Sequence, residues 1–89
     1  MSGNREVWFD PQPDDKLSQL WNRDEVIADA IEEAIDLIRN NDIRAKRRAF
    51  SGGIYLIEVR ARGEDWTILW EYDYDDAATI RYIGESTSI

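Results

Sequence analysis

The sequence predicts a small α+β domain: a short strand and a helical hairpin, then a three- to four-stranded antiparallel sheet. Two patterns predict it. Apolar residues recur at helical spacing between residues 26 and 38, which is typical of an amphipathic helix. From residue 54 onward, apolar residues alternate with polar ones, which is typical of half-buried strands. With 89 residues, the chain fits one domain, 1–89.

The first elements are a strand over 5–9 and a helix over about 14–22. Pro11 and Pro13 separate them, because proline is excluded from helix interiors and central strands. Asp14 and Asp15 suit the first turn of a helix, where the helix dipole favours negative charge. The apolar residues that follow at helical spacing are Leu17, Leu20 and Trp21.

The second helix is the strongest prediction, with Asn22 or Asp24 as its N-cap and its end near Asn40 and Asn41. Its apolar face is formed by Ile27, Ile31, Ala34 and Ile38, widened by Ala30 and Ile35. The opposite side carries Glu25, Asp29, Glu32 and Asp36. We interpret these acids as a solvated face; the alternative is a docking surface for a basic partner.

Three segments alternate apolar and polar residues, over 54–62, 66–74 and 78–84, after a turn at 51–53. The residues expected on the inner face are Tyr55, Ile57, Val59 and Ala61, then Trp66, Ile68, Trp70, Tyr72 and Tyr74, then Ala78, Ile80 and Tyr82. We expect the helical hairpin to cover this face, and we interpret Trp66 and Trp70 as core residues rather than stacking platforms.

Turn lengths set the predicted register. A four-residue loop over 62–65 places Ile57 beside Trp70. A three-residue turn over 75–77 produces three facing pairs of the kind that stabilise sheets, namely Trp70 with Tyr82, Leu69 with Ile83, and Glu71 with Arg81. On the outer face, Leu56, Leu69 and Ile83 then form an apolar patch among charges, which indicates a binding surface. The alternative is a patch too small to matter or covered by the chain's own terminus.

Composition excludes several classes of chemistry. The chain has no Cys and no His, so disulfides, thiolate nucleophiles, Ser-His triads and histidine-based zinc sites are absent. We expect no cofactor and no metal: Asp73, Asp75 and Asp76 lack the spacing of a calcium loop and suit a turn. No apolar run follows residues 1–5, so we expect no signal peptide, no membrane span and a cytoplasmic location.

The formal net charge of −8 is unevenly distributed: −7 over residues 1–38, +5 over 39–62 and −6 over 63–89. The basic middle contains Arg44, Lys46, Arg47 and Arg48. These cations are candidates for binding phosphate or an acidic protein segment. The alternative is that they only offset the acidic helix.

Over nearly its whole length the chain resembles the RelE/ParE toxin superfamily. The residues that carry the resemblance are Ile54-Tyr55-Leu56-Ile57-Glu58-Val59-Arg60, a turn with Gly63, Trp66-Thr67-Ile68-Leu69-Trp70 and Tyr82-Ile83-Gly84. The helical hairpin before them fits as well. The resemblance implies the toxin of a bacterial type II toxin–antitoxin pair, inhibited by a cognate antitoxin. RelE-like members cleave mRNA on the ribosome, and ParE-like members inhibit DNA gyrase.

The resemblance leaves enzymatic activity open. Only Arg60 matches a basic position on the second strand of RelE-like ribonucleases, where Leu56 and Glu58 take the other positions and Thr67 replaces an arginine on the next strand. RNA cleavage needs proton transfer and cations on the phosphate. The candidates for this role are Arg60, Arg81 and Tyr82, with Arg62 as a binding residue. The alternatives are a Glu71–Arg81 ion pair, a solubilising sheet face, and a non-catalytic protein-interaction module.

Overall fold

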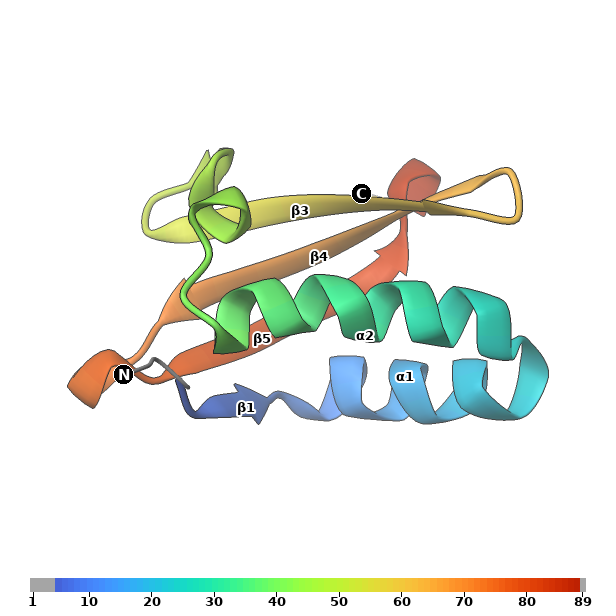
Figure 1. Ribbon diagram of the computed structural model, residues 1–89, viewed down its shortest axis with the longest axis horizontal. Helices are drawn as coiled ribbons and strands as arrows, with labels where there is room; N and C mark the ends of the chain where they lie inside the picture. The colour runs from blue at the N-terminus through green and yellow to red at the C-terminus, as the bar shows by residue number, and fades with distance from the viewer. Residues whose placement is uncertain (1–4, 89) are drawn as a thin grey trace.

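The computed structural model describes residues 5–88: two helices packed on one face of a five-stranded mixed sheet (Figure 1). Along the chain the elements are β1 (Val7–Phe9), α1 (Pro11–Arg23), α2 (Glu25–Arg39), the 3-10 helix η1 (Ile43–Lys46), β2 (Ala49–Ser51), β3 (Ile54–Ala61), β4 (Glu64–Tyr72), η2 (Tyr74–Asp76), β5 (Ala78–Glu85) and η3 (Ser86–Ser88). Residues 1–4, part of the segment used to judge a signal peptide, lie outside the described residues.

The α+β class is confirmed, but the predicted strand count is wrong. The sheet order is β1-β5-β4-β3-β2. β1 is parallel to β5, whereas the other neighbours are antiparallel. The extra strand is β2, a three-residue edge that pairs with β3 across the turn at Gly52 and Gly53. A strand this short carries almost no alternation for a sequence pattern to reveal.

Helix α1 begins at Pro11, three residues earlier than predicted. The first N–H groups of a helix have no partner within it, so prolines at the first and third positions remove no hydrogen bond. The Asp14 N–H donates to the Asp10 carbonyl at 3.1 Å, which closes this first turn. Of the two predicted caps for α2, Asp24 is the one used: its side chain accepts from the N–H groups of Val26 and Ile27.

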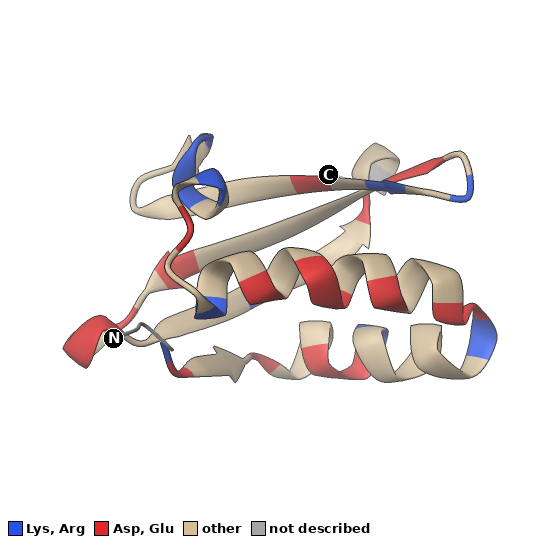
Figure 2. Cartoon of the chain, in the orientation of Figure 1, with Lys and Arg blue, Asp and Glu red and all other residues tan. Residues whose placement is uncertain are grey.

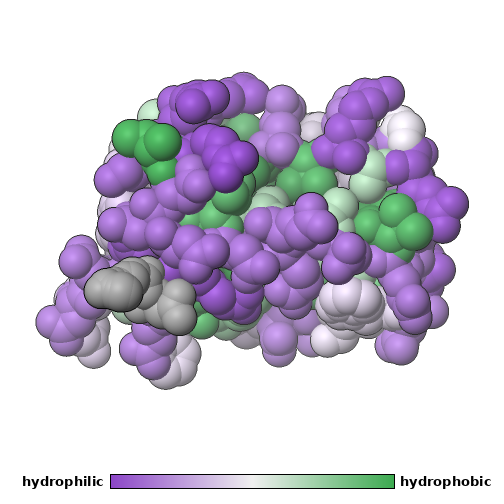
Figure 3. All heavy atoms as spheres, viewed as in Figure 1, coloured by the Kyte–Doolittle hydropathy of each residue, from purple (hydrophilic) through white to green (hydrophobic). Residues whose placement is uncertain are grey.

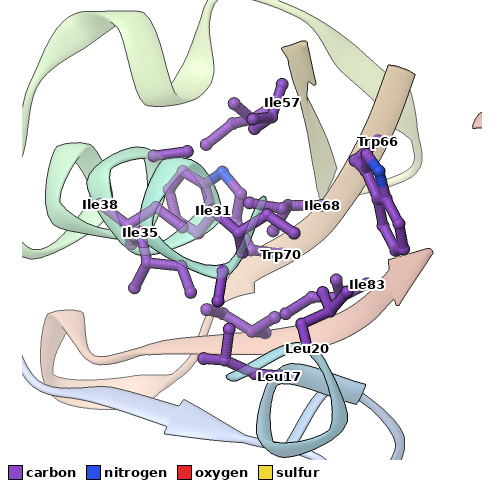
Figure 4. Packing of buried hydrophobic residues seen from close by; sticks show 14 of the residues in the cluster. Leu17, Leu20, Ile31, Ile35, Ile38, Ile57, Trp66, Ile68, Trp70 and Ile83 are labelled. Carbon is purple, nitrogen blue, oxygen red and sulfur yellow. The ribbon is translucent and has the colours of Figure 1, made fainter. Parts of the chain in front are cut away.

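The core lies between the helices and the inner sheet face (Figure 4). Helix α2 buries Ile27, Ala28, Ile31, Ala34, Ile35 and Ile38. Both predicted core tryptophans are confirmed, since Trp66 and Trp70 are 2% and 1% exposed. The Trp70 indole donates to the Ala45 carbonyl at 2.8 Å and contacts the ring of Tyr55 at 5.0 Å between centroids. The indole N–H of the buried Trp70 side chain therefore has a hydrogen-bond acceptor.

The β3–β4 hairpin turns on two residues rather than four. Arg62 and Gly63 both have positive φ, at 55° and 73°, which is the two-residue turn whose twist matches that of the strands. Ala61 therefore faces Glu64, and the pairing shifts by two residues along the ladder. Tyr55 rather than Ile57 lies beside Trp70, on the predicted face but in a different register.

The predicted β4–β5 register is also wrong, because the connecting loop is longer than predicted and β5 contains a bulge. Trp70 pairs with Ile80 and Leu69 pairs with Tyr82, so Arg81 is an extra residue on β5. A bulge reverses the alternation beyond it. Ile83 consequently points into the core at 0% exposure, and Tyr82 points to the outer face. This arrangement buries an isoleucine and leaves a phenol at the surface, which hydrophobic burial favours.

The loop between β4 and β5 has five residues, 73–77, rather than three. Asp75 and Asp76 adopt positive φ there, at 60° and 62°, a conformation that aspartate tolerates better than most residues. Tyr74, predicted to point inward at the end of a strand, instead lies in η2 with 82% of its surface exposed.

Asp42, ahead of η1, gives a prediction about acid stability. Hydrogen bonds from the Arg44 side chain and backbone lower the pKa of Asp42 from 3.8 to about 2. A carboxyl whose pKa is lower in the folded state stabilises the fold above its ordinary pKa, and this contribution disappears as pH falls through the folded value. We expect Asp42→Asn, which retains a capping side chain, to flatten the fall in urea midpoint between pH 4 and pH 2. An equally steep fall in both proteins would contradict this.

Candidate functional site

The outer face of the sheet, opposite the helices, is the candidate site. Leu56, Leu69 and Tyr82 face one another across β3, β4 and β5 and are half-buried. We call these three residues the outer row. The adjacent inner row, Ile57, Ile68 and Ile83, belongs to the core. The placement of Leu56 and Leu69 on the outer face agrees with the sequence, whereas Ile83 belongs to the core and Tyr82 takes its place.

Tyr82 is held over a glycine on the outer face. A Cβ atom built on Gly84 would lie 2.1 Å from the Tyr82 hydroxyl oxygen and 2.5 Å from the carbon that carries it. Only glycine lets the ring lie flat along its own strand in this way. The ring extends the apolar surface of the outer row past Leu69 and presents the phenol at its end.

The three arginines proposed from the strand segments, Arg60, Arg62 and Arg81, are all in ion pairs. Arg60 contacts Asp65 at 2.9 Å, and Arg62 contacts Asp24 at 3.3 Å. Arg81 contacts Glu71 at 2.6 Å, as predicted, and also Asp10 at 3.1 Å; the hydrogen bonds that its guanidinium donates to Glu71 and Asp10 raise the pKa of Arg81. Arg60 and Arg81 lie near the outer row, but Arg62 is at the hairpin tip beside the helices. The three guanidiniums do not converge on one point.

The cations of the basic segment 44–48 lie close together along the backbone (Figure 2) but contact separate partners. Arg44 pairs with Asp42 at 2.9 Å, and the Lys46 ammonium lies 5.7 Å from the centre of the Tyr72 ring. Arg48 pairs with Glu58 on the outer face at 2.9 Å. Within residues 5–88, Arg47 has no ion-pair partner. The segment therefore presents cations with separate contacts rather than one phosphate-binding cluster.

The exposed edge of β3 adjoins the outer row. β2 pairs with β3 only at Tyr55 and Ile54, and the Leu56 N–H donates to the Arg48 carbonyl at 2.9 Å. Beyond Leu56, the described part of the chain places no strand on this edge as far as Ala61. Figure 3 shows apolar side chains between this edge and α2 on an otherwise polar surface. An uncovered edge of this kind is available for pairing with another chain.

Sequence reasoning missed several residues of the outer face. Trp8 on β1 pairs with Thr79 and is 55% exposed, and Phe50 on β2 is 45% exposed. The alternation of Val7, Trp8 and Phe9 was a signal for Trp8. No local signal relates Asp10 to Arg81, because the two residues lie on segments 71 positions apart.

Among residues 5–88, no group of three or more acidic side chains is arranged to hold a metal ion. None of the helices described has the length and apolar character needed to cross a membrane. No protein-family model, curated protein or solved structure matches the chain. The assignment of function therefore depends on the residues and on the geometry of the outer face.

Proposed function

We propose that this protein is the toxin of a bacterial type II toxin–antitoxin pair and that it acts by binding a protein rather than by cutting RNA. The observation that carries the proposal is the outer row, an apolar strip of Leu56, Leu69 and Tyr82 bordered by arginines already neutralised by acids. A second support is the order of elements, with a strand and a helical hairpin before the antiparallel strands. This is the order on which the family resemblance depends.

Protein binding is favoured over mRNA cleavage because the arginines on the outer face are paired with carboxylates. Cleavage needs a proton acceptor and cations that can move onto the phosphate as charge develops. Here Arg60 and Arg81 are each held by a carboxylate, and the chain has no histidine. A phosphate approaching the outer face meets Glu58, Asp65 and Glu71 together with the arginines. DNA gyrase is the protein target that the resemblance implies.

The cognate antitoxin is the partner expected on the outer face. Burial of an apolar side chain contributes roughly 1.5–3 kcal/mol, so a segment covering the outer row gains most from Leu56 and Leu69. Arg48 and Arg60 border this row in exposed ion pairs with Glu58 and Asp65, so the rim is polar and its charges are balanced. The uncovered β3 edge beside the row offers main-chain groups to an extended segment.

A non-catalytic interaction module is the second candidate, and the strongly negative charge of the chain favours it. A net charge of −8 repels nucleic acid over the surface as a whole but is compatible with a basic protein partner. Toxicity distinguishes the two candidates. A toxin arrests growth when produced alone, whereas an interaction module leaves growth intact despite stable expression.

Introducing negative charges into the outer row tests the toxin proposal. We expect induction of the native protein in a bacterial host to arrest growth, and the product of the adjacent gene to relieve the arrest. The double variant Leu56→Glu with Leu69→Glu should permit growth and weaken antitoxin binding by at least tenfold. Each substitution replaces an apolar contact by a buried carboxylate in the complex. Growth curves and titration calorimetry measure the two effects.

Matched controls separate binding from folding and from RNA cleavage. Val26→Glu with Ile43→Glu makes the same change at exposed apolar residues away from the outer face, so this pair should remain toxic. Arg60→Ala should also remain toxic, and cellular mRNA should stay intact while gyrase supercoiling is inhibited. Harmless expression of the native protein would instead select the interaction module, and cleaved mRNA would restore the ribonuclease reading.

A further inference from the structure

A cavity with aromatic walls lies where β1 meets the β4–β5 loop, away from the outer row. Its volume is about 230 Å³, and it is lined by Glu6, Trp8, Asp73, Tyr74, Asp75 and Ala77. Two of these residues, Trp8 and Tyr74, are among the most exposed large aromatic residues described, at 55% and 82%. Exposed tryptophan and tyrosine beside a hollow are typical of binding sites rather than of a solvated surface.

The cavity wall is held by contacts between its two sides. Trp8 lies opposite Thr79 in the parallel β1–β5 ladder. The Thr79 hydroxyl donates to Asp73 at 3.0 Å, and the other carboxylate oxygen of Asp73 accepts from the Tyr74 N–H at 3.0 Å. The Ala78 N–H donates to the Glu6 carbonyl at 2.9 Å. The loop that carries Tyr74 is therefore fixed to the strand that carries Trp8.

The described lining of the cavity is negatively charged. It contains three carboxylates and no cation. The side chains of Glu6 and Asp75 make no hydrogen bond or ion pair with any described residue. The nearest arginine in sequence, Arg5, is directed elsewhere: its guanidinium donates to the Asp76 carbonyl at 2.8 Å and lies 4.6 Å from the centre of the Tyr72 ring.

We propose that this cavity binds one alkylammonium or guanidinium group. The faces of Trp and Tyr rings attract cations, and the carboxylates of Glu6 and Asp75 supply the opposite charge. The volume of the cavity limits the size of the ligand. At about 230 Å³, it is smaller than the roughly 300–1,000 Å³ of pockets for drug-sized molecules. The cavity therefore suits a single side chain. The proposal does not depend on toxin activity, because none of its residues belongs to the outer row.

Binding of capped amino acids to the intact protein tests the proposal. The probes are Nα-acetyl-lysine methylamide, the arginine analogue and the uncharged norleucine analogue. We expect the two cations, and not norleucine, to shift the Trp8 indole N–H resonance with saturation. Trp8→Ala, followed through the backbone amide of Thr79, and Tyr74→Ala should each weaken binding roughly twofold to fivefold, the range of a cation–π contact at an exposed site. Glu6→Gln with Asp75→Asn should weaken it further and reduce its salt dependence.

Two further measurements keep the result decisive. Trp21→Ala changes another exposed tryptophan, 41% exposed, and should leave affinity unchanged; circular dichroism confirms that each variant is folded. Spermidine distinguishes the source of the cation, because tighter binding of spermidine than of a lysine-containing peptide indicates a free polyamine and the reverse indicates a protein side chain. Equal shifts with norleucine, or unchanged affinity after the two acids are neutralised, would overturn the proposal.

Discussion

Replacing Ile83 with aspartate is expected to unfold the protein. Ile83 is fully buried against Ile68 in the inner row, and among the described residues no lysine or arginine is buried. An aspartate there loses the burial of an isoleucine, roughly 1.5–3 kcal/mol, and either desolvates its charge or takes up a proton at further cost. The total of at least about 4–5 kcal/mol approaches the roughly 5–15 kcal/mol that stabilises a typical domain.

Tyr82→Asp is the matched control. Comparing its stability with that of Ile83→Asp tests whether β5 contains the bulge. In the observed register Tyr82 lies on the outer face, so aspartate there remains solvated and should reduce stability by about 1–2 kcal/mol through lost contacts. Without the bulge at Arg81 the two positions would exchange faces. Urea unfolding and near-ultraviolet circular dichroism measure both variants. A folded Ile83→Asp protein beside an unfolded Tyr82→Asp protein would contradict the observed register.

Trp70→Ala is expected to remove about 3–5 kcal/mol from the free energy of unfolding, the range for deleting a large buried aromatic side chain. Trp70 is 1% exposed and contacts the rings of Tyr55 and Tyr72, with centroid distances of 5.0 Å and 5.1 Å. Truncation also leaves the Ala45 carbonyl without the indole donor at 2.8 Å, and Ala45 is itself buried. The urea midpoint and the melting temperature should both fall sharply.

Two other tryptophan variants separate the causes of that loss. Trp70→Phe retains a ring against Tyr55 but removes the donor to Ala45, so we expect a smaller loss of about 1–3 kcal/mol. Trp21→Ala changes a residue that is 41% exposed and should cost less than about 1 kcal/mol. Equal effects of Trp70→Ala and Trp21→Ala would contradict the placement of Trp70 at the centre of the core.

Elements with a long, regular pattern could be predicted from the sequence, whereas boundaries set by backbone geometry could not. Helix α2 shows four turns of apolar periodicity and a capping aspartate, and it was found with its cap among two candidates. The predicted start of α1 was too late because proline was taken to exclude a helix. In the first turn the N–H groups have no partner within the helix, so the two prolines fit there. The parallel pairing of β1 with β5 has no local signal at all.

Three features make the observed sheet register differ from the predicted one: the β3–β4 turn, the β4–β5 loop and the bulge at Arg81. Arg62 adopts positive φ in the β3–β4 turn, and arginine gives no indication of this conformation. The β4–β5 loop contains two consecutive aspartates with positive φ, and the bulge at Arg81 shifts one strand by a residue. Alternation alone cannot locate such an insertion, because the pattern on either side of it remains regular.

The same bulge explains which site residues were predicted correctly. Leu56 and Leu69 belong to β3 and β4, which contain no bulge, and lie where alternation places them; Tyr82 and Ile83 follow the bulge on β5 and exchange faces. The predicted Glu71–Arg81 ion pair is present, because the side chain of Arg81, the extra residue on β5, still reaches Glu71 on β4. Asp24 with Arg62, and Asp10 with Arg81, join segments distant in sequence, so these neutralised charges could only be found in three dimensions.

The parallel contact between β1 and β5 has a consequence for synthesis. Val7 lies 71 positions before its ladder partner Ala78, so it is translated well before that partner has left the ribosome. Until then, the helical hairpin has only part of the sheet to cover, and the first strand has no neighbour. The sheet is therefore complete only once β5 has left the ribosome, so a polypeptide interrupted before β5 never assembles the three-strand row of Leu56, Leu69 and Tyr82.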